Sequence, residues 1–379
     1  MSHYVIAVHC GAGYHSTQKE DAYKTLCKTA CIKVSRMLEK NIDAVESVTE
    51  AVRYLENSEL TNAGVGSNLN IRGSVECDAA IMEGKQLMFG AVGAISGVQN
   101  PVTVSAKLLT RQLGKKLSLG RLHPSVIVGE GANKWARENG LYTVDTGCLV
   151  TDYSRKTFNS HKTKLDILNE KINSKKRKFT VQSQEKSEES CAVLETEEGI
   201  QDTVGAIVMD TAGNIASAVS SGGISLKQPG RLGPAATYGA GCWAYNQRPG
   251  KPGVGTVTSG SGEHIMKTLL ARESALSIQR ENNVSLGLSN SFKESFLGCE
   301  QIKQQLQSEF LEGEKEKLAG VLALGQNEDK TVEVLWGHTT NSMCIGYMSP
   351  TLKRPKVVMS RLPEGGIPGQ SFTMSGVSV

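Results

Sequence analysis

The sequence predicts a mixed α/β fold, and three observations lead to this prediction. The chain begins with a nearly continuous apolar run at residues 4–9 that stops in a glycine turn, which is typical of a strand buried on both faces. Two stretches with apolar side chains at helical spacing follow, at 19–40 and from Asp43 onward. The second half opens with apolar segments at 203–209 and 215–223 around a Gly-Asn turn, the pattern of a β-hairpin.

The remaining elements follow in chain order. Asp43, with Glu46 three residues later, has the spacing of a helix cap and predicts the start of the second helix. A stretch rich in glycine and asparagine at 61–70 then leads into strands. A later helix begins near Glu263, where apolar residues recur on one face. The predicted strands outside the first segment and the hairpin are 79–82, 89–95, 319–324, 331–336 and 342–347.

Composition excludes several functional classes. The chain has 379 residues, 39% of them hydrophobic and 21% charged, which is enough to bury a sizeable core. The net charge is only +4, so no strong nucleic-acid or membrane field is expected, and no apolar stretch approaches the roughly 18–20 residues of a membrane span. The start of the chain lacks the pattern of a secretion signal, and the nine cysteines include no C-x-x-C pair, so a reducing intracellular compartment is the default.

The sequence also predicts no metal and no cofactor. The P-loop and H-E-x-x-H signatures are absent, and the glycine motifs at 239–241 and 253–255 do not lie between a strand and a helix as a dinucleotide fingerprint requires. His9 follows a buried strand alone, so a structural role is favoured over a ligand role. No G-x-S-x-G elbow is present either, which disfavours the usual α/β serine hydrolase.

The composition changes sharply between about 155 and 200. Residues 155–178 carry nine Lys or Arg against two acids, and 185–198 carry six Glu against one Lys. Such a block buries little apolar surface, so the sequence predicts a flexible charged loop. A loop of this length inside a compact fold has a function or has been cut.

Thr203 follows this loop directly and begins an apolar strand. A threonine at a strand start is usually only a good β former. If the bond between Asp202 and Thr203 is cut, however, Thr203 gains a free α-amine beside its hydroxyl. An α-amine has a pKa of about 7.7–8.0, so it serves as a general base for that hydroxyl without a histidine.

The sequence around Thr203 resembles the plant-type asparaginase family of N-terminal-nucleophile hydrolases. The resemblance covers nearly the whole chain except the charged loop and parts of the C-terminal third. It rests on QDTVGA at 201–206, VSSGG at 219–223, KQPGRLG at 227–233, HCGAG at 9–13, NAGVGS at 62–67, NP at 100–101 and SGSGE at 259–263. Within the family the chain most resembles the threonine aspartases, on ECDA at 76–79, GCWA at 241–244, RLP at 361–363 and GQS at 369–371.

This resemblance implies a fold and a maturation step. The fold is a single four-layer αββα sandwich over residues 1–379, made as a precursor that cuts itself between Asp202 and Thr203. The products are an α subunit, 1–202, which contains the charged loop, and a β subunit, 203–379. The two form an αβ heterodimer that can pair further to (αβ)2.

The resemblance also assigns catalytic residues. Ser221 matches a position where asparaginases carry a second threonine, and its hydroxyl would orient Thr203; the alternative is an ordinary strand-end serine. Ser259 and Gly260 match the segment that stabilises the oxyanion, although asparaginases have a threonine-glycine pair there. Because Thr258 is adjacent, the register of this assignment is open by one residue.

The residues expected to bind substrate differ between asparaginases and threonine aspartases. Arg231 matches the arginine that holds the substrate carboxylate, with a surface arginine as the alternative, and Asn62 is the second implied substrate-binding residue. Three residues after this arginine, asparaginases carry an aspartate that pairs with the substrate's α-amine, but here the residue is Pro234. Its loss fits an aspartate inside a polypeptide, whose nitrogen is a neutral amide.

The sequence therefore predicts a threonine endopeptidase that cuts protein substrates after an internal aspartate. The resemblance implies nuclear regulators as substrates, of the trithorax-type methyltransferase and TFIIA-precursor classes. The basic run at 175–178 has the form of a nuclear-import signal, although most charge runs are simply solvated, so nucleus and cytoplasm are the expected locations. The alternatives are an isoaspartyl peptidase/L-asparaginase and a non-catalytic scaffold, and retention of Thr203, Ser221 and Arg231 argues against the scaffold.

Overall fold

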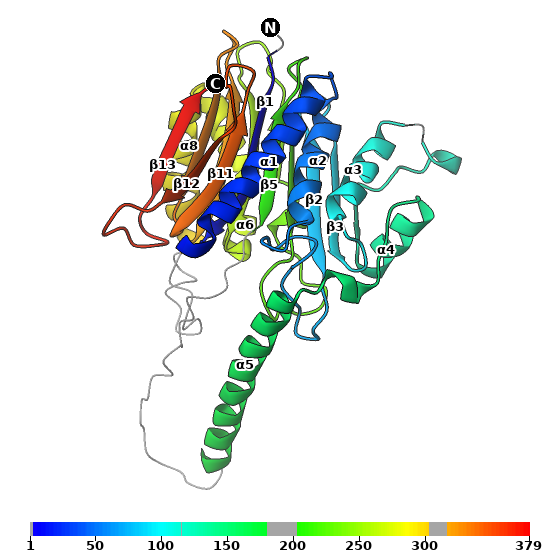
Figure 1. Ribbon diagram of the computed structural model, residues 1–379, viewed down its shortest axis with the longest axis vertical. Coiled ribbons are helices and arrows are strands. Elements are labelled where there is room, and N and C mark those ends of the chain that lie inside the picture. Colours follow the sequence, from blue (N-terminus) through cyan, green and yellow to red (C-terminus); the bar gives the residue numbers. More distant parts are fainter. Residues whose placement is uncertain (1–2, 115, 180–202, 303–316) are drawn as a thin grey trace.

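Two β-sheets pack face to face at the centre of the protein, with helices on both outer faces (Figure 1). The computed structural model describes residues 3–114, 116–179, 203–302 and 317–379. The arrangement is the four-layer αββα sandwich that the resemblance implies. Of the two residues at the predicted subunit boundary, Asp202 lies outside the described residues and Thr203 is described. The boundary therefore stays a prediction.

The larger sheet has eight strands and holds both strands of the predicted hairpin. All neighbouring strands are antiparallel except β3 and β4. In spatial order the strands are β12 (Lys356–Arg361), β11 (Ser342–Met348), β1 (Val5–Gly13), β5 (Val204–Met209), β6 (Ile215–Ser221), β2 (Cys77–Glu83), β3 (Phe89–Ile95) and β4 (Val126–Val128).

The smaller sheet has five strands, all antiparallel to their neighbours. Strands β1, β5 and β6 of the larger sheet contact β8 of the smaller one across the interior. The order is β13 (Thr373–Ser378), β10 (Val332–His338), β9 (Ala319–Gln326), β8 (Gly253–Gly260) and β7 (Cys242–Tyr245).

Helices cover the outer face of each sheet because their apolar stripes match the outward-facing strand residues. On the larger sheet lie α1 (Glu20–Leu38), α2 (Ala44–Glu56), α3 (Pro101–Gln112) and α4 (Gly129–Glu138). On the smaller sheet lie α6 (Gly262–Thr268), α7 (Leu270–Glu281), α8 (Val284–Asn290) and a π-helical turn, Ser291–Leu297. Short 3-10 turns occur at Thr17–Lys19, Ser118–Gly120, Thr146–Leu149 and Pro234–Ala236.

Local hydrogen bonds fix the hairpin that starts at Thr203. Asp210 accepts the backbone N–H of Ala212 and of Asn214, which closes the turn between β5 and β6. Its other carboxylate oxygen accepts the N–H of Ala44 at the start of α2. The predicted cap of α2 is confirmed as well, since Asp43 accepts the N–H of Glu46 at 2.9 Å. The hairpin is therefore anchored to the helix layer behind it.

The predicted loop over 155–200 is wrong for its first part. Residues 152–179 form α5 (Asp152–Phe179), a long helix that projects from the body of the protein (Figure 1). Thr151 and Ser154 cap it reciprocally, and Lys162 pairs with Asp166 one turn further on. The stretch contains no glycine or proline, so local helix propensity orders it without burial of a large apolar face. The rest of the predicted loop, from 180, lies outside the described residues.

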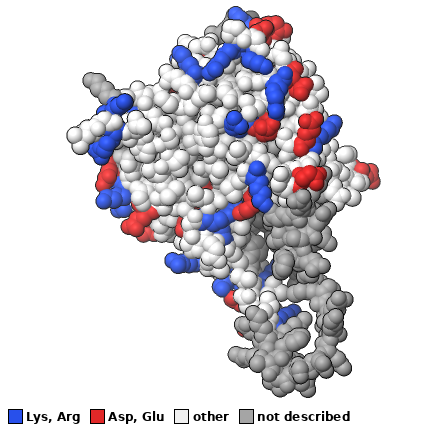
Figure 2. All heavy atoms as spheres, turned by 180° about the vertical axis from the view of Figure 1, so that it is seen from behind, with Lys and Arg blue, Asp and Glu red and all other residues white. Residues whose placement is uncertain are grey.

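The surface carries both signs of charge. Figure 2 shows a face on which Lys and Arg lie near Asp and Glu around the rim, with few charged side chains at the centre. Within the described part of the chain, no helix is long and apolar enough to cross a membrane. The basic run at 175–178 lies in the last turns of α5.

Candidate active site

Thr203 and Ser221 are in direct contact at the open end of the hairpin. The Thr203 hydroxyl donates to Ser221 Oγ over 3.0 Å, and both residues are buried. The antiparallel register, in which Val204 lies opposite Ser220, places Thr203, which immediately precedes β5, beside Ser221, the last residue of β6. Two residues eighteen positions apart in the sequence are thus joined by a hydrogen bond.

Strand alternation turns both hydroxyls toward the space between the sheets. Gly205, two residues after Thr203, faces Val257 of β8, and Ser217, four residues before Ser221, lies beside Gly255 of the same strand. Because side chains at i and i+2 share a face, Thr203 and Ser221 point the same way. Ser220 points to the opposite face, where it lies near Glu56 of α2.

The segment that contains Asn62 supports the end of β6. Its backbone carbonyl accepts the N–H of Gly222 at 2.7 Å, and its side-chain amide donates to the carbonyl of Gly223 at 2.8 Å. Asn68 donates to the same carbonyl, and Gly223 in turn donates its N–H to Ser221 Oγ at 3.0 Å. These bonds attach Asn62 to the loop that follows Ser221, at Gly222 and Gly223. The substrate-binding role of Asn62 stays a prediction.

Gly222 has no room for a side chain. A Cβ there would lie 2.3 Å from Asn62 Oδ1 and 2.5 Å from Ser67 Cβ. These separations are far below van der Waals contact, so the close approach of the two loops requires glycine. The glycine pair after Ser221 thus serves the packing of the site.

Arg231 lies next to this loop and is held by Glu263. Its Nε and Nη2 both donate to Glu263 Oε1, over 3.0 and 2.6 Å. Nη1 approaches Gly223 and Gly233, since a Cβ at those positions would lie 3.2 and 3.3 Å from it. The predicted carboxylate-binding group is thus adjacent to the residue that bonds Ser221.

A buried lysine and a buried aspartate lie near Arg231. Lys227 is only 2% exposed, and its ammonium donates to the carbonyl of Glu76 at 2.7 Å. Asp78 accepts the N–H of Gly233 at 2.7 Å and so fixes the loop that carries Arg231. Burial raises the pKa of the Asp78 carboxyl, and the nearby Lys227 cation opposes that rise. The sequence alone did not indicate that Lys227 and Asp78 are buried and hold the backbone around Arg231.

Strand β8 separates the two candidate oxyanion residues. Thr258 donates to the carbonyl of Ala240 at 2.9 Å, which turns it away from the space between the sheets. Ser259 faces that space, because Val257 on the same face contacts Gly205, and its Oγ accepts the N–H of Ala12 at 3.0 Å. The Ser259 hydroxyl keeps its own proton to donate, so the geometry favours Ser259 in the register left open by the sequence.

Gly260 and His9 hold the neighbouring backbone. Gly260 has a φ of 133°, and a Cβ there would lie 2.4 Å from the carbonyl oxygen of Leu318, so no larger residue fits. The N–H of Gly11 donates to Nδ1 of His9, and the pairing of β1 with β11 shifts register between His9 and Ala12. Burial lowers the pKa of His9 to about 3, so the ring is neutral near pH 7 and fits the structural role expected from the sequence.

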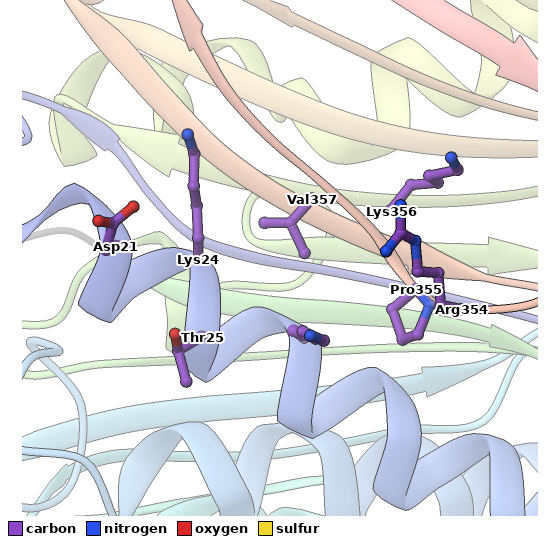
Figure 3. Close-up of a pocket in the computed structure, with 8 residues that line it drawn as sticks. Asp21, Lys24, Thr25, Arg354, Pro355, Lys356 and Val357 are labelled. Atoms are coloured by element: carbon purple, nitrogen blue, oxygen red, sulfur yellow. The ribbon is translucent and has the colours of Figure 1, made fainter.

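A hollow elsewhere on the surface is unrelated to these residues. It has a volume of about 390 Å³ and lies between α1 and the start of β12, lined in part by Lys24, Lys28, Arg354 and Lys356 (Figure 3). None of the predicted site residues lines it. Asp202, the predicted residue before the cut, lies outside the described residues.

The family can now be identified from comparison with known proteins. Residues 2–348 match the sequence profile of the family described as asparaginase. The isoaspartyl peptidase/L-asparaginase of Xenopus laevis is 35% identical over 269 residues, which cover 71% of this chain and 74% of that protein. The isoaspartyl peptidase of Escherichia coli is 32% identical over 281 residues, 73% of this chain and 77% of that protein.

The chain belongs to the asparaginase family. Membership makes it a hydrolase with the N-terminal-nucleophile fold. The asparaginase-family relatives are similar to this chain over regions on both sides of Thr203, while their names refer to isoaspartyl peptidases and asparaginases. The specificity of this member is a separate question from its family.

Proposed function

We propose that this protein is a threonine endopeptidase of the taspase type, which cuts itself between Asp202 and Thr203 and then cuts other proteins after an internal aspartate. The observation that carries the proposal is the buried Thr203–Ser221 hydrogen bond, near Arg231, at a site where position 234 is a proline. The site supplies a nucleophile and a cation for a carboxylate, but position 234 supplies no carboxylate for a substrate amine.

Self-cleavage begins with attack of the Thr203 hydroxyl on the carbonyl carbon of Asp202. The C–O bond forms, the peptide C–N bond breaks, and the proton from the hydroxyl ends on the released Thr203 amine, which gives an ester. Water then hydrolyses that ester and leaves Thr203 with a free amine and a free hydroxyl. Ser221 Oγ accepts a hydrogen bond from the Thr203 hydroxyl and so orients the Thr203 oxygen before it attacks.

Turnover repeats the same attack on a substrate. The Thr203 amine takes the hydroxyl proton and delivers it to the leaving nitrogen, and water releases the acyl group. In the proposed role, Ser259 donates its hydroxyl to the developing oxyanion, with the N–H of Gly260 beside it. Arg231 binds the aspartate side chain of the substrate through charge-assisted hydrogen bonds.

Pro234 supports an internal aspartate as the substrate. It is buried and begins the 3-10 turn Pro234–Ala236, and its ring lies close to Gly262 beside the arginine. A proline ring offers neither a negative charge nor a hydrogen-bond acceptor in its side chain. The α-nitrogen of a free amino acid or a β-aspartyl dipeptide carries a positive charge, whereas that of an internal aspartate is a neutral amide.

The second candidate is an isoaspartyl peptidase/L-asparaginase. The names of the relatives, from Xenopus laevis and Escherichia coli among others, favour it directly. Both candidates use Thr203 and present a carboxylate to Arg231, so they differ only in how the substrate nitrogen is recognised. A change at position 234 is the feature that separates them.

Two experiments test the proposal. Purified protein is incubated and analysed on a denaturing gel with N-terminal sequencing; two bands with a new terminus at Thr203 are expected, and Thr203→Ala should give one band. The mature enzyme is then offered a peptide with one internal aspartate, a β-aspartyl dipeptide and free asparagine. Faster cleavage of the dipeptide or of asparagine would establish the second candidate, and a single uncut wild-type band would point to a scaffold.

We also propose that the αβ product pairs further to (αβ)2 and enters the nucleus through the basic run at 175–178. The run's place at the end of projecting α5 supports access by an import receptor. Sedimentation measures the assembly. Unchanged nuclear localisation after deletion of 175–178 would refute the import signal.

A further inference from the structure

The ion pair between Arg231 and Glu263 is one-sided. Glu263 Oε1 accepts from Nε and Nη2, the two donors on one edge of the guanidinium. Nη1 has no hydrogen-bond partner among the described residues, and it is the nitrogen that approaches Gly223. Because the N–H of Gly223 also donates to Ser221 Oγ, Nη1 lies on the side of the arginine that is toward Ser221.

The local structure holds this arrangement in place. Glu263 lies in the first turn of α6, and Gly262 before it lets the arginine approach, since a Cβ at 262 would lie 2.8 Å from Nη2. The Arg231 side chain is 15% exposed, whereas that of Glu263 is 51% exposed. The carboxylate therefore contacts the arginine from the solvent side, and the arginine is the more buried partner.

We propose that Glu263 is a positioning residue for substrate recognition: it holds the Nε–Nη2 edge of Arg231 so that Nη1 is presented to the substrate's carboxylate. This inference rests on the proposed function, in which Arg231 binds that carboxylate. An unrestrained arginine loses rotamer freedom when it binds, and Glu263 removes that cost in advance. Glu263 remains bound to the arginine while substrate is present and does not compete for it.

The test compares Glu263→Ala, Glu263→Gln and wild type, with Glu294→Ala as a control because Glu294 is an exposed acid on the same helical layer. For Glu263→Ala we expect KM to rise about tenfold with kcat within twofold, which corresponds to one immobilised side chain. Glutamine keeps an acceptor oxygen without the charge, so Glu263→Gln should raise KM only about two- to threefold. The control should match wild type, and melting curves should be alike for all variants.

A double-mutant cycle shows whether Glu263 acts through the arginine. On an Arg231→Ala background, Glu263→Ala should raise KM no further. A fall in KM for Glu263→Ala would mean that Glu263 competes with substrate, and an unchanged KM would mean a merely structural pair; either result overturns the inference.

The assay uses whichever substrate the wild type cleaves, the internal-aspartate peptide or the β-aspartyl dipeptide, since both carry a carboxylate. If the dipeptide alone is cleaved, the proposed function fails while the role of Glu263 is still measured on that substrate. If only free asparagine is cleaved, the proposed function again fails and the role of Glu263 is measured on asparagine; a wild type that cleaves none of the three refutes both.

Discussion

Replacement of Ser221 by alanine is the sharpest test of the catalytic pair. Ser221 Oγ accepts the Thr203 hydroxyl and the N–H of Gly223, each at 3.0 Å. Ser221→Ala removes the group that directs the nucleophile and leaves the partly buried N–H of Gly223 without this partner. We expect kcat to fall about 100-fold, or about 2.7 kcal/mol of activation free energy, because a misdirected nucleophile loses its near-attack geometry. Loss of the bond from the Gly223 N–H should cost about 0.5–1.5 kcal/mol of folding stability.

Ser220→Ala is the matched control for this change. It deletes the same atoms one residue away, but Ser220 faces α2 and not Thr203. Its kcat should stay within about threefold of wild type, the range of an indirect effect. Ser221→Thr restores a hydroxyl of the kind asparaginases carry there, so most of the activity should return.

The assay is steady-state cleavage by protein whose mature Thr203 terminus has been verified by sequencing. Self-cleavage of the precursor is followed separately on gels, because Ser221 orients the same oxygen in both reactions. The reasoning fails if Ser221→Ala keeps kcat within threefold of wild type, or if Ser220→Ala loses as much activity as Ser221→Ala.

Three further predictions follow from the surroundings of the site. Gly222→Ala should lower both the melting temperature and self-cleavage, because its Cβ would collide with Asn62 and Ser67; normal cleavage on a gel would contradict this. Burial raises the pKa of Glu56 to about 8, so the native state keeps a proton that the unfolded state loses above about pH 4.5, and stability should decline as pH rises toward 8; Glu56→Gln should flatten that decline in melting curves. Pro234→Asp should shift the ratio of kcat/KM toward β-aspartyl dipeptides, with Pro234→Ala as the control that lacks the new charge; an unchanged ratio would remove position 234 as the determinant.

Much of the larger sheet could be predicted because its signals are local. The apolar run at 4–9, the segment 89–95 and the hairpin at Thr203 correspond to β1, β3 and the β5–β6 pair. Each has continuous small or branched apolar residues, which need no knowledge of the rest of the fold. The glycine turn predicted after residue 9 is wrong, because β1 continues through Gly11 to Gly13 and pairs there with β11. The cap at Asp43 is equally local.

Other parts of the molecule depend on contacts between distant segments. Strand β8 was not predicted, because its glycines and threonines have weak strand character and are fixed by packing against β5 and β9. Helix α5 was not predicted: the low hydrophobic content of residues 155–178 indicated a loop, although residues of this type favour a helix. The bond of Arg231 to Glu263 joins residues 32 apart, and no spacing rule indicates such a pair.

The strand order of the larger sheet has a consequence for a chain cut before Thr203. Strand β1 of the first fragment would stand between β11 and β5 of the second, while β6 of the second would pair with β2 of the first. The fragments would then be interleaved rather than docked: neither would hold the complete larger sheet alone, although the smaller sheet lies wholly within the second fragment. Separation would require breaking three backbone ladders at once, so the cut pieces should exchange partners no faster than the whole protein unfolds.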